Sequence, residues 1–321
     1  MSSVPSSLAP SVREGMRLVE GGVFMMGSSA FYPEEAPRRK VRVASFWVDE
    51  TPVTNAQFAA FVEATGYRTF AETAPDPRDY PGMDPALAVA GSLVFTMTDR
   101  PVDLGDPSQW WRWVEGACWR HPLGPDSGIE EILDHPVVHV THQDAAAYAA
   151  WAGKRLPTEA EFEFAARGGL EDCEYAWGDE LTPGGEHRAN TWQGMFPFAN
   201  TAADGWVRTS PVRAFPANGY GIHDMIGNVW EICEDWWSLP SEARPRRKSA
   251  CCAIDNPRGG FRAKSHDPSE PTAKIPRKVI KGGSHLCAPS YCQRYRPAAR
   301  HPQSIDSSTS HIGFRCVKGA D

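Results

Sequence analysis

The chain has 321 residues, 41% of them hydrophobic, which is enough for one large domain with a sizeable core. Its 33 Lys and Arg against 40 Asp and Glu give a net charge of −7, which argues against nucleic acid as the main partner. No apolar run approaches the roughly 18 residues of a membrane-spanning helix, so we expect no membrane segment. Residues 1–15 are rich in Ser and Pro and predict a disordered tail without a secretory signal. We therefore expect a cytoplasmic protein with mostly reduced cysteines.

The counts of 28 Gly, 28 Pro and 12 Trp predict an irregular fold, with many turns pinned by large aromatic side chains. Residues 19–27 predict a strand entered through the Gly21-Gly22 turn. Residues 41–48 alternate loosely between apolar and polar, and we expect them to be its hairpin partner.

Three helices are predicted from capping signals. The signals are Thr54 with Gln57, Thr141 with Asp144, and Thr158 with Glu161. Residues 68–135 show little periodicity and predict a long insertion, whereas 135–140 predict a short strand. Residues 238–279 contain few apolar side chains and predict a mobile loop beside the segment that follows. We expect residues 16–321 to form a single domain.

The most informative segment is residues 281–296, in which four residues separate Cys287 from Cys292. Spacing alone favours two buried thiols, or a structural disulfide in an oxidising compartment. Two thiolates that converge on one point also form a soft site, which suits copper(I) better than a hard cation. The same pair could instead act as a redox couple, so spacing leaves these alternatives open.

The neighbouring residues favour chemistry over a purely structural role. The Gly282-Gly283 turn and Pro289 predict a loop and not a helix face. Ser284, Tyr291 and Arg294 place hydroxyl groups and a fixed cation near the sulfurs. Such neighbours lower a thiol pKa and so favour the thiolate that binds metal.

Residues 281–296 resemble the catalytic segment of the formylglycine-generating enzymes, also called sulfatase-modifying factors. The shared pattern is Gly-Gly-Ser-x-x-Cys-x-x-x-x-Cys-x-Arg-Tyr-Arg, and residues 312–316 match the family's later Gly-Phe-Arg-Cys. Further family-like segments are 53–55, 136–138, 151–159, 165–169, 177–178, 218–221 and 227–231. The resemblance implies an α+β fold of the formylglycine-generating-enzyme and C-type-lectin-like kind. Such a fold has short antiparallel strands, about three helices and much irregular loop.

The resemblance implies a copper-dependent oxidase. Cys287 and Cys292 would hold copper(I), and molecular oxygen would oxidise a peptidyl cysteine to Cα-formylglycine. The implied substrate is the Cys-x-Pro-x-Arg motif of an unfolded or nascent sulfatase, held in an extended groove. The arginine of that motif suits a net acidic protein.

By resemblance, the active-site positions beside the pair are Ser284, Tyr291, Arg294 and Trp230. The two hydroxyl groups are assigned to oxygen binding, proton delivery and orientation, the guanidinium to local charge, and the tryptophan to a place near the metal. The chain departs from the family at Ala288, where many members have His, and at Ile232, where they have Trp. His285 is the candidate substitute for the missing histidine, although its loop position predicts an exposed side chain.

The resemblance also implies two structural calcium sites. The first would use the side chains of Asn190 and Asp204 with the carbonyls of Thr191 and Trp206. The second would use the side chains of Asp224 and Glu231 with the carbonyls of Gly227 and Val229. Calcium prefers such sets of side-chain and backbone oxygens. From the residues alone, the two aspartates would only cap turns.

The other six cysteines carry weaker expectations. The resemblance implies that Cys316, a disulfide partner in some family members, is free here, because Ala166 occupies the position expected to pair with it. We expect small core residues at Cys118, Cys173 and Cys233. The adjacent Cys251 and Cys252 are most simply loop thiols.

Two other functional classes remain open at the level of sequence. The same scaffold could serve as a non-catalytic module that binds a peptide or glycan, although binding alone needs no thiolates. A thiol–disulfide oxidoreductase would use the cysteine pair without copper or oxygen. We expect a monomer in each case.

Overall fold

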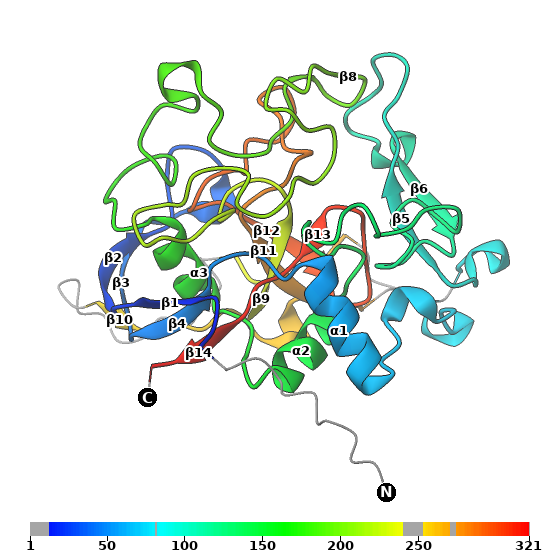
Figure 1. Ribbon diagram of the computed structural model, residues 1–321, viewed down its shortest axis with the longest axis horizontal. Helices are drawn as coiled ribbons and strands as arrows, with labels where there is room; N and C mark the ends of the chain where they lie inside the picture. Colours follow the sequence, from blue (N-terminus) through cyan, green and yellow to red (C-terminus); the bar gives the residue numbers. More distant parts are fainter. Residues whose placement is uncertain (1–12, 81, 240–252, 270–273, 321) are drawn as a thin grey trace, which may run out of the picture.

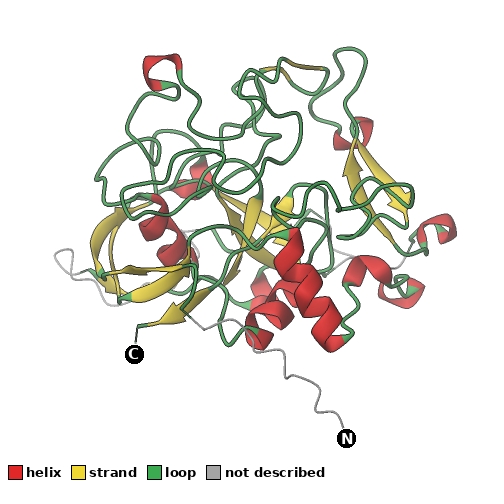
Figure 2. Ribbon diagram, in the orientation of Figure 1, coloured by secondary structure: helices red, strands yellow, loops and turns green. Residues whose placement is uncertain are grey.

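The computed structural model describes residues 13–80, 82–239, 253–269 and 274–320. The α-helices within these ranges are α1 (Asn55–Thr65), α2 (His142–Trp151) and α3 (Glu159–Ala166). The strands are β1 (Met16–Val19), β2 (Gly22–Met26), β3 (Arg39–Val43), β4 (Phe46–Asp49), β5 (Gly91–Phe95), β6 (Trp111–Glu115), β7 (Gly194–Met195), β8 (Ala199–Asn200), β9 (Trp230–Trp236), β10 (Ile254–Asp255), β11 (Arg277–Lys281), β12 (Arg300–Ser304), β13 (Ile312–Gly313) and β14 (Val317–Gly319). Loops fill much of the molecule, especially the upper half of Figure 2, as the Gly and Pro content predicts.

In the part of the chain that the structure describes, seven single-turn 3-10 helices interrupt the loops. They are η1 (Pro33–Glu35), η2 (Phe70–Glu72), η3 (Pro77–Asp79), η4 (Pro85–Leu87), η5 (Pro107–Gln109), η6 (Pro183–Gly185) and η7 (Arg262–Lys264). Five of them begin with proline, whose fixed φ suits the first turn of a helix.

The three predicted helices are confirmed, and each begins with the expected capping box. In α1, the Thr54 side chain accepts the Gln57 N–H while the Gln57 side chain accepts the Thr54 N–H. The same reciprocal bonds begin α2 and α3. These bonds satisfy N–H groups that a helix start leaves without partners.

The sheets are small, and their pairing differs in part from the expected hairpin. Their strand orders are β1-β4-β14, β10-β3-β2, β12-β11-β9-β13, β5-β6 and β7-β8. The β2–β3 hairpin is confirmed, but β4 leaves it and pairs with β1 and β14 instead. Most pairs are antiparallel, whereas β10 with β3 and β13 with β9 are parallel. The C-terminal strand β14 thus pairs with β4, which belongs to the N-terminal part of the chain.

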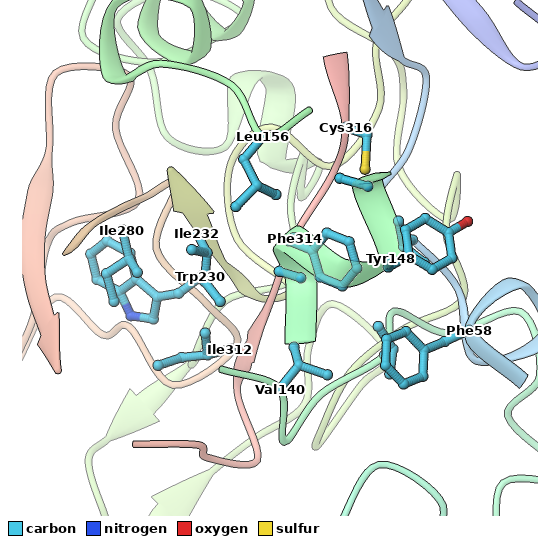
Figure 3. Packing of buried hydrophobic residues seen from close by; sticks show 14 of the residues in the cluster. Phe58, Val140, Tyr148, Leu156, Trp230, Ile232, Ile280, Ile312, Phe314 and Cys316 are labelled. Atoms are coloured by element: carbon cyan, nitrogen blue, oxygen red, sulfur yellow. The ribbon is translucent and has the colours of Figure 1, made fainter. Parts of the chain in front are cut away.

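The main hydrophobic core lies between α1, α2 and the four-stranded sheet (Figure 1). Figure 3 shows Phe58 and Tyr148 from the helices, with Trp230, Ile232 and Ile312 from the sheet, around one continuous cluster. Cys287 belongs to the same cluster, so its side chain anchors the cysteine segment to the core formed by the sheet and the helices.

The irregular regions differ in part from the sequence-based expectations. The predicted strand at 135–140 is wrong: only Pro136 forms an isolated bridge there, and His139 has a φ of 60°, which breaks an extended strand. The apparently aperiodic insertion contains the β5–β6 hairpin. The described parts of 238–279 contain β10, η7 and the start of β11, and its mobility stays a prediction.

Candidate active site

A glycine turn carries the chain from β11 into the cysteine segment. Gly282 and Gly283 have φ values of 90° and 73°, a region that side chains rarely adopt. A Cβ at Gly283 would lie 2.9 Å from the backbone of Arg294 and Tyr295, so the returning chain needs a glycine there. This close return folds the segment into a compact loop at the end of β11.

The two cysteine sulfurs converge within that loop. The Cys292 N–H donates to the carbonyl of Ala288 over 2.8 Å, which closes one turn between the cysteines. The Sγ atoms of Cys287 and Cys292 lie 3.5 Å apart, well beyond the S–S bond length of about 2.05 Å. Both are free thiols, with Cys287 only 2% exposed and Cys292 half-buried. One sulfur is therefore deep in the core and the other is nearer the surface.

The two thiols, Cys287 and Cys292, have pKa values shifted in opposite directions. Burial raises the pKa of Cys287, and the neighbouring Cys292 raises it further. The hydrogen bond from Cys287 lowers the pKa of Cys292 to about 6, and the Arg294 guanidinium also lowers it. Near neutral pH the arrangement is thus a Cys287 thiol that donates to a Cys292 thiolate. A single thiolate with an adjacent thiol is prepared for metal or for redox chemistry.

Ser284 contacts one sulfur of the pair and Arg294 contacts the other. Ser284 is buried, its N–H points to the Cys287 sulfur over 3.4 Å, and its Oγ accepts the Leu286 N–H over 3.2 Å. Arg294 places Nη1 3.8 Å from the Cys292 sulfur. Both residues contact a sulfur.

Tyr291 lies at the surface beside the pair, with 40% of its area exposed. Its ring stacks on Phe196 at a centroid distance of 4.5 Å and meets Trp110 edge-on at 5.6 Å. Burial of its hydroxyl end raises the pKa of Tyr291, which keeps the phenol protonated at neutral pH. Tyr291, Phe196 and Trp110 therefore form a packed aromatic cluster beside the half-buried sulfur of Cys292.

Trp230, labelled in Figure 3, is buried in the hydrophobic cluster that contains Cys287. The centroid of its ring lies 5.8 Å from that of His301. The two departures from the family pattern are also buried. Ile232 lies in the cluster of Trp230, whereas Ala288 lies in a second cluster. Its aromatic members include Phe95, Trp110, Trp192 and Phe196.

His285 is not the exposed histidine that we expected. It is buried, and its Nδ1 lies 2.8 Å from the carbonyl oxygen of Asn228. Burial lowers the pKa of His285 to about 4, so the ring is neutral near pH 7. The expectation was wrong because the loop turns this side chain inward, against the Asn228 turn.

The first expected calcium loop has one unsatisfied oxygen. The Asn190 Oδ1 is buried without a hydrogen-bond partner, while its Nδ2 donates to the Arg208 carbonyl over 2.8 Å. The Asp204 carboxylate accepts the N–H groups of Thr191 and Trp206, each over 3.0 Å. Asp204 therefore closes the turn, and the orphaned amide oxygen is available for a cation.

The second expected loop is already cross-linked. Both oxygens of the buried Glu231 accept from Arg315, with Nε–Oε2 and Nη2–Oε1 distances of 2.7 Å. Asp224 accepts the N–H of Arg213 over 2.9 Å. The other two expected ligands on this turn are the carbonyls of Gly227 and Val229. Arg315 therefore neutralises the Glu231 carboxylate and cross-links this turn, and calcium binding here stays a prediction.

The remaining described cysteines differ in burial. Cys316 is a free, buried thiol, as expected, and Cys118 and Cys233 are buried core residues. The core expectation was wrong for Cys173, which is half-buried beside a cavity that Arg38 and Asp172 also line. Cys251 and Cys252 lie outside the described residues.

The cysteine pair is a site with few protein ligands. The described ranges contain no group of three or more His, Cys, Asp or Glu side chains arranged to hold a metal ion. A metal at the cysteine pair would therefore have two protein sulfur ligands, a low coordination number that suits copper(I). None of the described helices has the length and apolar character needed to cross a membrane.

Sequence reasoning missed a contribution from a distant segment. Glu34 Oε1 accepts from Arg294 Nη2 over 2.6 Å, although the two residues are 260 positions apart. The Tyr32 hydroxyl accepts the N–H of Gln293 over 3.0 Å. No local pattern around residues 31–35 signals these contacts, because they arise only when the tertiary fold forms.

Comparisons with known proteins show the family of this chain. Residues 3–320 match the family profile of the sulfatase-modifying factor enzyme 1-like domain. The chain is 57% identical over 302 residues to the formylglycine-generating enzyme of Mycobacterium tuberculosis, covering 92% of this chain and 95% of that protein. It is 47% identical over 323 residues to the formylglycine-generating enzyme of Thermomonospora curvata, covering 98% and 96%. The solved structure of PvdO from Pseudomonas aeruginosa superposes with a TM-score of 0.59 at 25% identity, covering 95% and 94%. The chain belongs to the formylglycine-generating enzyme family.

Proposed function

We propose that this protein oxidises a cysteine of a sulfatase polypeptide to Cα-formylglycine, with molecular oxygen as oxidant and copper(I) held by Cys287 and Cys292. The observation that carries the proposal is the unbridged pair of sulfurs, 3.5 Å apart at the edge of the core. Membership of the family supports the reaction class. A module that only binds peptides or glycans needs no such pair.

The two sulfurs have different tasks in this proposal. Bound copper would supply a soft centre that accepts the substrate sulfur and activates oxygen. Cys287, deep in the core, anchors the site, while the half-buried Cys292 faces the side from which substrate arrives. The proton that the pair shares must leave when metal binds. Arg294, with Nη1 3.8 Å from the Cys292 sulfur, then stabilises the remaining negative charge.

Tyr291 and Ser284 are assigned to orientation and proton transfer. The phenol of Tyr291 stays protonated because burial raises its pKa, so it can donate a hydrogen bond beside the sulfur pair. Its stacking on Phe196 restricts the ring to one orientation. Ser284 holds the Cys287 sulfur through its N–H, and Trp230 excludes water from the same cluster. These contacts keep the reacting region dry on the core side.

We further propose that calcium binds in the first loop in a structural role. The buried Asn190 Oδ1 without a partner supports it, with Asp204 and the carbonyls of Thr191 and Trp206 as further oxygens. The second expected site, with Asp224, Glu231 and the carbonyls of Gly227 and Val229, has weaker support, because Arg315 already neutralises the Glu231 carboxylate.

The substrate and setting extend the proposal. The target is the Cys-x-Pro-x-Arg motif of an unfolded or nascent sulfatase, and the net charge of −7 favours its arginine. The cytoplasmic location, the monomeric state and the single catalytic domain over residues 16–321 stay predictions.

Aerobic incubation of copper(I)-loaded protein with a Cys-x-Pro-x-Arg peptide tests the proposal by mass spectrometry. We expect the mass change that replaces CH2SH by CHO, and it should require both copper and oxygen. A peptide with Ser in place of Cys is the matched control and should stay unchanged. Peptide disulfide formation without copper would instead establish the thiol–disulfide oxidoreductase. If the peptide is not converted either with or without copper, the result would favour the binding module.

A further inference from the structure

A short segment near the start of the described chain contacts the part of the cysteine segment that follows Cys292. Residues 31–35, which include η1, place two adjacent carboxylates against two arginines of that part. Glu34 pairs with Arg294 and Glu35 pairs with Arg296, at shortest N–O distances of 2.6 and 2.5 Å. The two pairs have the same chemistry and lie side by side, so their differences are informative.

The Glu35–Arg296 pair is buried inside the fold. Both side chains are at most 2% exposed, and Arg296 Nε also donates to the Gln293 carbonyl over 2.8 Å. The Glu34–Arg294 pair lies further out, with exposed fractions of 15% and 19%. Its guanidinium is the one that reaches a sulfur, with Nη1 3.8 Å from Cys292. The outer pair therefore joins the distant segment to the candidate copper ligands.

The Arg294 guanidinium is restrained on two sides. Its Nε and Nη2 donate to the same carboxylate oxygen, Glu34 Oε1, over 3.1 and 2.6 Å. Its plane lies over the Tyr32 ring, 3.9 Å from the centroid. These contacts occupy the edge and one face of the guanidinium, and they leave Nη1 directed at the sulfur. The Tyr32 hydroxyl is itself fixed, because it accepts the N–H of Gln293.

We propose that Glu34, with Tyr32 beneath the guanidinium, is a positioning residue that fixes Arg294 against the Cys292 sulfur and so supports copper(I) binding. The functional meaning of this inference rests on the proposed copper site. The restraint itself depends only on the contacts between residues 31–35 and Arg294. Residues that orient the groups around metal ligands typically contribute about 10- to 100-fold to metal affinity.

Two substitutions at one position separate placement from charge. Glu34→Ala removes the oxygen that accepts both hydrogen bonds. Glu34→Gln removes the charge but keeps an amide Oε1 that can accept both bonds. We expect copper(I) affinity, measured by competition with a chromophoric copper(I) chelator, to fall about tenfold or more in Glu34→Ala. Glu34→Gln should recover most of that loss.

A second readout needs no copper. In metal-free protein, the Arg294 Nε–H should exchange slowly with water in the wild type and in Glu34→Gln, as measured by nitrogen-15 NMR. It should exchange fast in Glu34→Ala, and Arg294→Lys assigns the signal. A role of Glu34 in overall stability alone would leave this exchange unchanged under native conditions.

The matched control is Glu50→Ala. Glu50 has nearly the same exposed fraction, 16%, and pairs with Arg213 over 2.7 Å, but no sulfur lies in that pair. Its copper(I) affinity should equal that of the wild type. Unchanged affinity in Glu34→Ala, or an equal loss in Glu34→Gln, would overturn the inference. If the wild type binds no copper(I), the proposed function fails, and the NMR exchange alone then decides whether Glu34 positions Arg294.

Discussion

The cysteine segment 281–296 and the turn 224–231 lie beside one another but use their polar groups in opposite ways. The segment leaves β11 and the turn enters β9, which are neighbours in one sheet. The two regions are joined by the Gly227 N–H to the Gly282 carbonyl, over 2.9 Å. In the turn, a buried arginine occupies the Glu231 carboxylate, whereas in the segment the two thiols contact each other and remain unbridged. One region uses its polar groups to stabilise the fold, and the other keeps them available for a ligand.

The strongest test of this contrast replaces either sulfur. Cys287→Ser and Cys292→Ser should each lower peptide oxidation by on the order of 10³-fold or more, because the pair acts as one unit. The melting temperature should change little in Cys292→Ser, whose side chain is half-buried, and should fall in Cys287→Ser, which places a hydroxyl group in the hydrophobic cluster. Turnover by mass spectrometry and thermal unfolding of the same samples give the two values. Full activity in either variant would contradict the copper site.

A substitution in the neighbouring turn 224–231 should instead lower stability and leave activity unchanged. Glu231→Gln leaves Arg315 buried without its counter-charge, which should lower the free energy of unfolding by about 3–5 kcal/mol. Activity per folded molecule should stay near that of the wild type. Urea unfolding measures the loss, and Asp255→Asn is the control because its partner Arg42 is exposed. That surface pair should contribute less than about 1 kcal/mol. A stable but inactive Glu231→Gln protein would undo the contrast.

Calcium removal should separate the two oxygen loops. If calcium binds the first loop, a chelator should destabilise the wild type by about 3 kcal/mol when the metal was present at 100 times its dissociation constant. The Asn190→Ala variant should lose that sensitivity, because the buried amide oxygen is gone. Asp224→Asn, in the cross-linked turn, should keep it. Differential scanning calorimetry with and without chelator measures both, and an unresponsive wild type would refute this calcium site.

A smaller effect concerns pH. Burial lowers the pKa of His139 from 6.5 to about 4, so the unfolded chain binds more protons than the folded one between these values. This contribution is present in full above pH 6.5, and stability falls by up to roughly 1.4 kcal/mol per pH unit as the pH drops toward 4. His139→Asn should flatten the dependence, since Asn tolerates the positive φ at this position. Urea unfolding at pH 5 and 7 measures the slope, which should not change if His139 does not titrate.

Local signals predicted local structure well. Each capping box marked a helix start, because its hydrogen bonds join residues three apart. The Gly282-Gly283 turn marked the sharp entry into the cysteine segment, because the positive φ values there require glycine. The cysteine pair was found for the same reason, since both sulfurs lie on one loop.

The failures concern contacts between distant parts of the chain. The Arg315–Glu231 pair spans 84 positions, and the Glu34–Arg294 pair spans 260, so no local pattern predicts either. The strand predicted at 135–140 had a suitable apolar pattern, but the bend at His139 decided its conformation. Its ring is held by Ser92, 47 positions away. Tertiary contacts here overrode local propensity.

The parallel pairing of β13 with β9 has a consequence for biosynthesis. Residues 312–314 follow both cysteines in the chain, yet Ile312 and Phe314 belong to the core cluster that surrounds Cys287. A ribosome therefore delivers the thiols before the residues that enclose them. During that interval the core cluster that contains Cys287 is incomplete, so the Cys287 thiol reaches its buried position only after residues 312–314 have been added. A deletion within 312–319 should impair the sulfur site without touching either cysteine.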